Sequence, residues 1–305
     1  MSSPLTSHTA SVEQLRKFAA GGYLYAILDA YQAPAVPPKV QELGKERALS
    51  LFVGTAEQKY WELAPYLIAV EEATLDWILQ DLGSQPWGVF ALSKSGLETL
   101  RTHFRRFLIV QLPDGERWYF RYYDPRILTI YLSKCLPHEL EIFYGPIRGF
   151  AIPDVDTGDI SLFYMTEGPR IENISPPPLW QVRPEQLEAL QQASQGDLEA
   201  NIIGQLRSVL PEQYRCLSDQ DMRKAVRYGL ERAKSHRITK ETDVARYIGL
   251  MFAFGADFDR DPALPWAAAI LGDPGLPDPI AKLDRLWQAG EKVIAQARAI
   301  RTGAS

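Results

Sequence analysis

The chain has few of the residues that build disulfide frameworks or metal sites. It contains two cysteines and four histidines among 305 residues. Cys135 and Cys216 lie far apart and in no CxxC pair, and no histidine lies four positions from another. We therefore expect no disulfide framework, no metal site and no cofactor, and the pattern fits a reducing compartment.

Long apolar runs and an excess of positive charge are also missing. No run approaches the ~20 apolar residues that a transmembrane helix needs. The first residues, MSSPLTSHTASVEQ, show neither the basic nor the apolar region of a secretory signal. The net charge is −5 and the isoelectric point about 5.5, which argues against non-specific attraction to nucleic acid or anionic lipid. We expect a cytoplasmic protein with no membrane and no nucleic-acid partner.

Familiar catalytic motifs are missing as well: there is no GxGxxG, GxxxxGK[ST], HExxH or GxSxG. The carboxylates of Glu71, Glu72 and Asp76 follow a predicted strand, and an enzyme of unrecognised class that uses them for acid–base chemistry stays an alternative. Adjacent residues at a strand end point to opposite faces, and Asp76 suits the first turn of a helix. We therefore expect no catalytic residues and no enzyme.

What the chain does contain is a clear change of pattern at Ser175-Pro176-Pro177-Pro178, a proline-rich segment that predicts a linker. Before it, apolar runs at 23–28, 48–53, 66–70 and 87–92 alternate with helical spacing, and 147–152 with 160–165 predicts a hairpin. Residues 1–178 are expected to form an α/β lobe, a mixed β-sheet flanked by helices.

Residues 179–305 show helical spacing alone and are expected to form an all-α helical bundle lobe. Two helices are expected before Pro211, the first marked by Leu187 and Leu190 and the second running from Leu198 to Val209. Capping patterns predict helix starts at Ser95, Ser218, Thr239 and Asp278, and the segment 33–38 is expected to be a proline-rich loop.

The most informative stretch is FLIVQLPDGERWYFRYYDPRIL, residues 107–128. The Pro113-Asp114-Gly115 turn predicts a β-hairpin. Its second strand is expected to place Trp118, Phe120 and Tyr122 on one face and Tyr119, Arg121 and Tyr123 on the other. Asp124 followed by Pro125 predicts a helix N-cap.

Two arginines, Arg121 and Arg126, flank this cap and have two interpretations. Arg121 can pair with Asp124 as part of the scaffold, or it can be an exposed recognition group, since Arg, Tyr and Trp are enriched at interface hot spots. The structural pairing is favoured. The candidate residues for partner binding or for the motif scaffold are Trp118, Arg121, Tyr122, Asp124 and Arg126.

A second alternative function comes from the basic segment 215–240, and in particular its helical part 223–240. The segment is locally basic in an acidic protein, so a nucleic-acid-binding module is kept as an alternative. Such a run is more often a solvated helix face.

The order of YLYAILDA, PYLIAV, FRYYDPR and FYGPI, followed by GLMFAFGADFDRDPALPW, resembles a known family. It is the type VI secretion effector chaperone or adaptor family, catalogued as domain of unknown function 4123. The resemblance covers about residues 23–190, and its most specific piece runs from Phe120 to Arg126.

The resemblance implies a non-catalytic cytoplasmic adaptor of a Gram-negative bacterium. Such a protein binds a cognate secreted toxin effector, often through the N-terminal region of the toxin, and helps load it onto the secretion spike protein. The family supplies no catalytic residues, so Arg121, Asp124 and Arg126 carry over as motif positions.

Overall fold

The computed structural model describes residues 4–83, 85–155, 157–166, 179–209 and 217–302. The chain divides into two compact units, Met1–Gln191 and Gln192–Ser305, which are described separately. The expected division after residue 178 stays a prediction, and the proline-rich segment 175–178 lies outside the described residues.

The first unit is built on a seven-stranded sheet in the order β1-β9-β8-β5-β2-β4-β3, with antiparallel pairs throughout. Its strands are β1 (Leu5–Ala10), β2 (Leu24–Asp29), β3 (Ala48–Ser50), β4 (Pro65–Ala69), β5 (Gly88–Ser93), β8 (Ile147–Pro153) and β9 (Ile160–Met165). β2 and β5 lie at the centre and are buried along their whole length. At the start of β5, a Cβ atom on Gly88 would lie 1.9 Å from the Ile27 carbonyl oxygen. Any other residue at this position would therefore clash with β2, and glycine allows the two strands to pair at their observed separation.

A smaller sheet has the order β10-β6-β7 and comprises β6 (Ile109–Gln111), β7 (Arg117–Tyr119) and β10 (Trp180–Gln181). β6 and β7 are antiparallel, whereas β10 and β6 are parallel. The α/β prediction for this lobe is confirmed, with the parallel pair confined to the small sheet.

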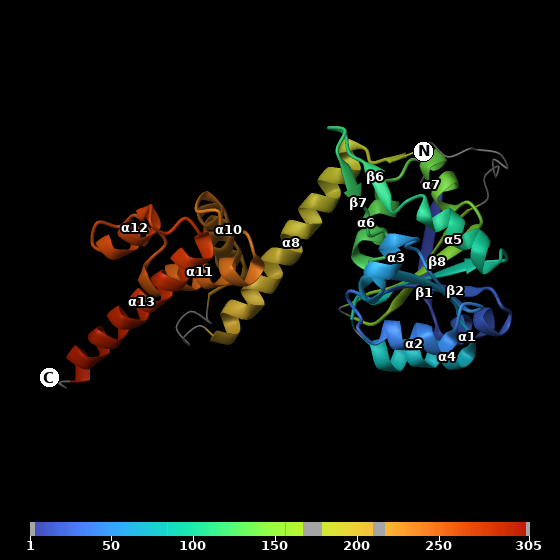
Figure 1. Cartoon of the computed structure of the whole chain (residues 1–305), viewed down its shortest axis with the longest axis horizontal. Helices are drawn as coiled ribbons and strands as arrows, with labels where there is room; N and C mark the ends of the chain where they lie inside the picture. The colour runs from blue at the N-terminus through green and yellow to red at the C-terminus, as the bar shows by residue number, and fades with distance from the viewer. Residues whose placement is uncertain (1–3, 84, 156, 167–178, 210–216, 303–305) are drawn as a thin grey trace. The chain divides into compact units, whose positions relative to one another are not determined.

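Helices cover both faces of the large sheet (Figure 1). Along β2, Tyr25 and Ile27 face one apolar core, and Leu24, Ala26 and Leu28 face the other, as the period of a strand requires. α1 (Val12–Ala20), α2 (Val36–Leu43) and α4 (Glu72–Trp77, continued by the π-helical turn Ile78–Leu82) pack on the second core, whereas α5 (Leu97–Arg105), α6 (Pro125–Lys134) and α7 (Pro137–Tyr144) pack on the first.

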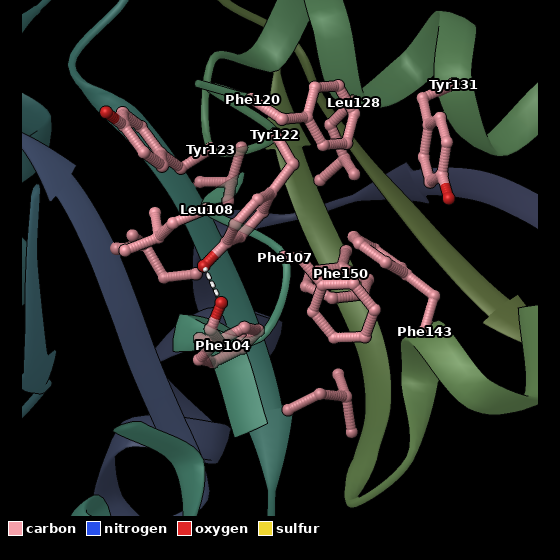
Figure 2. Packing of buried hydrophobic residues seen from close by; sticks show 14 of the residues in the cluster. Phe104, Phe107, Leu108, Phe120, Tyr122, Tyr123, Leu128, Tyr131, Phe143 and Phe150 are labelled. Carbon is pink, nitrogen blue, oxygen red and sulfur yellow. Dashed lines mark hydrogen bonds between the residues drawn. The ribbon is translucent and has the colours of Figure 1, made fainter. Parts of the chain in front are cut away.

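The first core is strongly aromatic (Figure 2). The rings of Phe107 and Phe143 pack edge-on with centroids 4.8 Å apart, and Phe143 and Phe150 lie 5.7 Å apart. Tyr122 is fully buried among them and donates a hydrogen bond of 2.9 Å to the Phe104 carbonyl oxygen. This candidate residue therefore belongs to the core that holds the small sheet and α5 on the large sheet.

The predicted hairpin turn is confirmed, since Gly115 has φ +89° and its N–H donates to the Leu112 carbonyl. The predicted alternation beyond it was wrong after Tyr119. β7 ends there, and a turn in which the Asp124 N–H donates to the Arg121 carbonyl leads into α6. As a result Tyr122 and Tyr123 are both buried instead of lying on opposite faces.

Other local predictions also needed correction. The expected loop 33–38 contains the start of α2. Proline is tolerated there because the backbone N–H groups of the first helical turn have no hydrogen-bond partner within the helix, so their absence costs nothing. α5 begins after Gly96 without a side-chain cap from Ser95, and α11 (Glu241–Phe254) has Lys240 rather than Thr239 at its N-cap.

The second unit is helical, as predicted. It contains α8 (Pro184–Val209) from Gln192 onward, α10 (Asp219–Ser235), α11, α12 (Pro265–Gly272) and α13 (Pro279–Thr302). α8 is one continuous helix, so the prediction of two helices before Pro211 was wrong. Ser218 and Asp278 cap α10 and α13 as expected, each accepting from backbone N–H groups of the first turn. Among the described residues, no helix is both long and apolar enough to cross a membrane.

Candidate functional site

The principal partner of Arg121 is Asp29, the last residue of β2. The Arg121 guanidinium forms an ion pair with the Asp29 carboxylate, whose side chain is 0% exposed. Asp124 lies 3.7 Å from the same Arg121 nitrogen. The predicted pairing of Arg121 with Asp124 was therefore incomplete, because the closer carboxylate comes from a strand 92 positions earlier.

Burial makes this pair sensitive to the loss of either member. Desolvation raises the pKa of the Asp29 carboxyl above its ordinary value, and the charge of Arg121 acts in the opposite direction. The Asp29 carboxylate also accepts a hydrogen bond from the backbone N–H of Tyr31, at 3.1 Å. The pair thus ties the end of β2 to the segment that follows β7.

Asp124 is the buried N-cap of α6, as the sequence predicted. Its Oδ1 accepts from the Arg126 backbone N–H at 3.1 Å and from Arg126 Nε at 3.0 Å. Arg126 Nη2 lies 2.7 Å from Oδ2. Asp124 therefore binds both arginines of the motif, while the Arg126 side chain stays 43% exposed.

Exposed aromatic and aliphatic side chains gather near this buried pair, at the end of the sheet where β2 and β3 finish and β4 begins. We call this set the β2-end surface. Its members are Tyr31, Val53, Tyr60, Trp61, Leu63 and Tyr119. The antiparallel order β2-β4-β3 brings the segments after β2, after β3 and before β4 to the same end.

Three contacts connect members of this surface to the motif and to the segment after β3. The Arg121 guanidinium lies over the ring of Tyr31, 5.6 Å from its centroid, and Tyr31 is 62% exposed. Tyr119 packs edge-on against Phe52, which follows β3, with centroids 5.9 Å apart. The hydroxyls of Tyr119 and Tyr123 are 3.0 Å apart. The buried ion pair therefore contacts Tyr31 directly, and Tyr119 is held beside it by Phe52 and Tyr123.

The five predicted site residues differ in their exposure to solvent. Tyr122 and Asp124 are buried, Arg121 is largely covered, and Trp118 and Arg126 are exposed. Whether any of them contacts a partner stays a prediction. The sequence reasoning missed Tyr31, Val53, Trp61 and Leu63, since an apolar residue near a strand end has no local signal that tells an exposed position from a core position.

The three carboxylates of the enzyme alternative each form an ion pair with an arginine. Glu71 lies 3.0 Å from Arg47, and Arg16 lies 2.9 Å from Glu72 and 2.5 Å from Asp76. Arg16 belongs to α1, so these contacts fasten α4 to α1. The enzyme alternative stays a hypothesis, and this geometry gives the carboxylates a structural role.

The basic segment of the nucleic-acid alternative lies mainly on α10. Arg227 pairs with Glu199 at 2.8 Å, and Lys224 lies 3.7 Å from Asp221. These contacts are typical of a helix face with mixed charge rather than of a uniformly basic surface.

A third basic residue of α10, Arg232, forms an ion pair with the buried Asp259. Asp259 also accepts from the Tyr247 hydroxyl and from His236 Nε2, both at 2.7 Å. Because α10, α11 and the segment after α11 all contribute to this cluster, Asp259 holds these three parts of the second unit together.

Comparison with known proteins gives one match. Residues 24–141, from β2 into α7, match the family described as Domain of unknown function (DUF4123). The resemblance drawn from the sequence is therefore confirmed over these residues, which lie within the first unit. No curated protein matches the chain, and no solved structure matches it. The matched range includes Asp29, the FRYYDPR motif and every member of the β2-end surface.

Proposed function

We propose that the protein is an adaptor for type VI secretion, which binds a cognate toxin effector and helps load it onto the secretion spike protein. In this role it works in the cytoplasm, binds the N-terminal region of the toxin and catalyses no reaction. The family match over residues 24–141 supports the general role, and the partners are those that the sequence resemblance implies.

The observation that carries the proposal is the β2-end surface. Its exposed members include Tyr31, Trp61 and Tyr119. Tyrosine and tryptophan provide large contact areas with little loss of side-chain freedom, and they are enriched among residues that dominate binding energy. The underlying Arg121–Asp29 pair holds part of this surface in place before a partner arrives, which lowers the entropic cost of association.

Co-expression tests the proposal directly. The full chain, carrying an affinity tag, is produced together with each toxin encoded beside its gene, and the captured material is analysed by mass spectrometry. We expect one toxin to co-purify in stoichiometric amount, and we expect Tyr31→Ser and Trp61→Ser to reduce capture strongly.

A matched control comes from the other end of the same strand. Tyr23 precedes β2 and is 43% exposed, close to the 37% of Trp61. Tyr23→Ser should leave capture unchanged. The proposed function is rejected if no toxin co-purifies with the wild-type chain, and the β2-end surface is rejected if Tyr23→Ser and Trp61→Ser have equal effects.

A further inference from the structure

The β3 edge of the large sheet and the β7 edge of the small sheet differ in how they are covered. At the β3 edge, Arg101 of α5 covers the strand, because its Nε donates to the Ser50 carbonyl at 2.8 Å and its Nη2 reaches the Phe52 carbonyl at 3.4 Å. β7 is an edge strand of the small sheet, and all three of its side chains are exposed. An uncovered edge is a template for another strand.

The register shows which backbone groups of β7 point outward. The Phe120 N–H donates to the Leu108 carbonyl, and the Leu112 N–H donates to the Glu116 carbonyl. Because hydrogen-bonded pairs alternate along an antiparallel ladder, Glu116, Trp118 and Phe120 face β6. Arg117 and Tyr119 then direct their N–H and C=O groups away from β6. An added strand can therefore form up to four backbone hydrogen bonds with these two residues.

The side chains along this edge also favour particular residue types in a strand that pairs with β7. Tyr119 lies opposite Ile109 on β6, and both side chains are exposed, so they present an apolar pair on one face. Arg117 is exposed and forms no ion pair within the described part of the chain. A strand added here would place one residue beside Tyr119 and another beside Arg117, where an apolar and an acidic residue respectively give favourable cross-strand pairs.

We propose that β7 binds an extended segment of the toxin effector as an additional antiparallel strand. Since the partner runs opposite to β7, its apolar residue comes first and its acidic residue two positions later, which gives the order apolar-x-acidic. This inference rests on the proposed adaptor function and deepens it, because Tyr119 belongs both to β7 and to the β2-end surface. Strand addition supplies backbone affinity, while alternate side chains supply specificity.

Proline substitution tests the backbone part of the proposal. Arg117→Pro removes an outward N–H and leaves the ladder between β6 and β7 intact. Short overlapping peptides that cover the co-purified toxin serve as probes, with fluorescence anisotropy on the full chain as the measurement. We expect the bound peptides to contain apolar-x-acidic, and we expect Arg117→Pro to weaken their binding at least about tenfold.

The other sheet provides a matched proline control. In β1 the Thr166 N–H donates to the Pro4 carbonyl, so by the same alternation Ser7 points its N–H away from β9. Ser7→Pro therefore removes an outward donor from an edge strand of the large sheet. It should leave peptide binding within about twofold of wild type. Equal losses for Ser7→Pro and Arg117→Pro would overturn the assignment to β7.

Charge reversal tests the side-chain part with a substitution that the fold tolerates, because Arg117 is exposed. Arg117→Glu should weaken binding of the acidic peptide, and replacing the acidic residue of the peptide by lysine should restore it. If the wild-type chain captures a toxin but both Arg117 variants capture it equally well, the β7 proposal fails while the adaptor function stands. If sedimentation shows instead that β7 pairs with a second copy, so that Arg117→Pro dissociates a dimer without affecting toxin capture, the proposal is likewise overturned.

Discussion

Removing the Arg121 guanidinium should strongly destabilise the first unit. The perturbation is Arg121→Met, which keeps much of the aliphatic stem and removes the charge. Asp29 is fully buried, and its carboxylate also accepts from the uncharged Tyr31 N–H. The variant therefore leaves a buried carboxylate without a counter-charge.

The expected loss follows from that geometry. Breaking a buried ion pair by removing one partner costs about 3–5 kcal/mol, because the other charge stays desolvated. Asp124 cannot compensate, since it is itself acidic. The pKa of Asp29 should rise further in the variant, because the charge that opposed desolvation is gone. Part of the lost stability should therefore return as the pH is lowered and Asp29 becomes protonated.

The assay is hydrogen exchange of the β2 and β5 amides, followed by mass spectrometry across a denaturant series, because it reports on the first unit alone. Arg126→Met is the matched control. Its ion pair with Asp124 is part-exposed, and it should cost about 1 kcal/mol or less. In a double-mutant cycle, Asp29→Asn combined with Arg121→Met should cost less than the sum of the two single changes. A loss below about 1 kcal/mol for Arg121→Met would refute the reasoning.

Three further predictions concern other buried groups. Burial lowers the pKa of His103 from 6.5 to about 4. The contribution of neutral His103 to the free energy of unfolding is therefore complete above pH 6.5 and is lost as the pH falls toward 4. Denaturant titrations should show that the free energy of unfolding falls by roughly 3 kcal/mol over that pH range, and His103→Gln should remove most of this pH dependence. Gly88→Ala should cost more than about 3 kcal/mol by thermal unfolding, because its Cβ would meet the Ile27 carbonyl, whereas Gly158→Ala, with open space around it, should cost about 1 kcal/mol. Asp259→Ala should cost about 3 kcal/mol or more in the second unit, measured by hydrogen exchange of α10 and α11, because Arg232 loses its buried counter-charge.

Each of these three has an outcome that contradicts it. A pH slope that is the same in wild type and His103→Gln would assign the acid sensitivity to other groups. Equal costs at the two glycine positions would mean that β2 and β5 can separate locally. Unchanged exchange of α10 in Asp259→Ala would remove Asp259 from its structural role.

Much of the fold could be predicted from local patterns. The apolar runs of β2, β4 and β5 are short and bounded by turn residues, so they indicate strands without further information. The strand β1 was missed because its residues, LTSHTA, do not alternate clearly between apolar and polar. Pairing with β9 makes this segment a strand, and that pairing depends on residues about 160 positions away.

In and around the FRYYDPR motif, some features depend on the local sequence and others depend on contacts with distant residues. The sequence by itself determined the Pro113-Asp114-Gly115 turn and the Asp124 cap, because both depend on hydrogen bonds within a few residues. Tertiary structure alone decided that Arg121 pairs with Asp29, that Tyr122 is buried, and that β7 is an edge strand in the described part of the small sheet. Those three outcomes depend on which distant strand and which core lie beside the motif, and no local spacing carries that information.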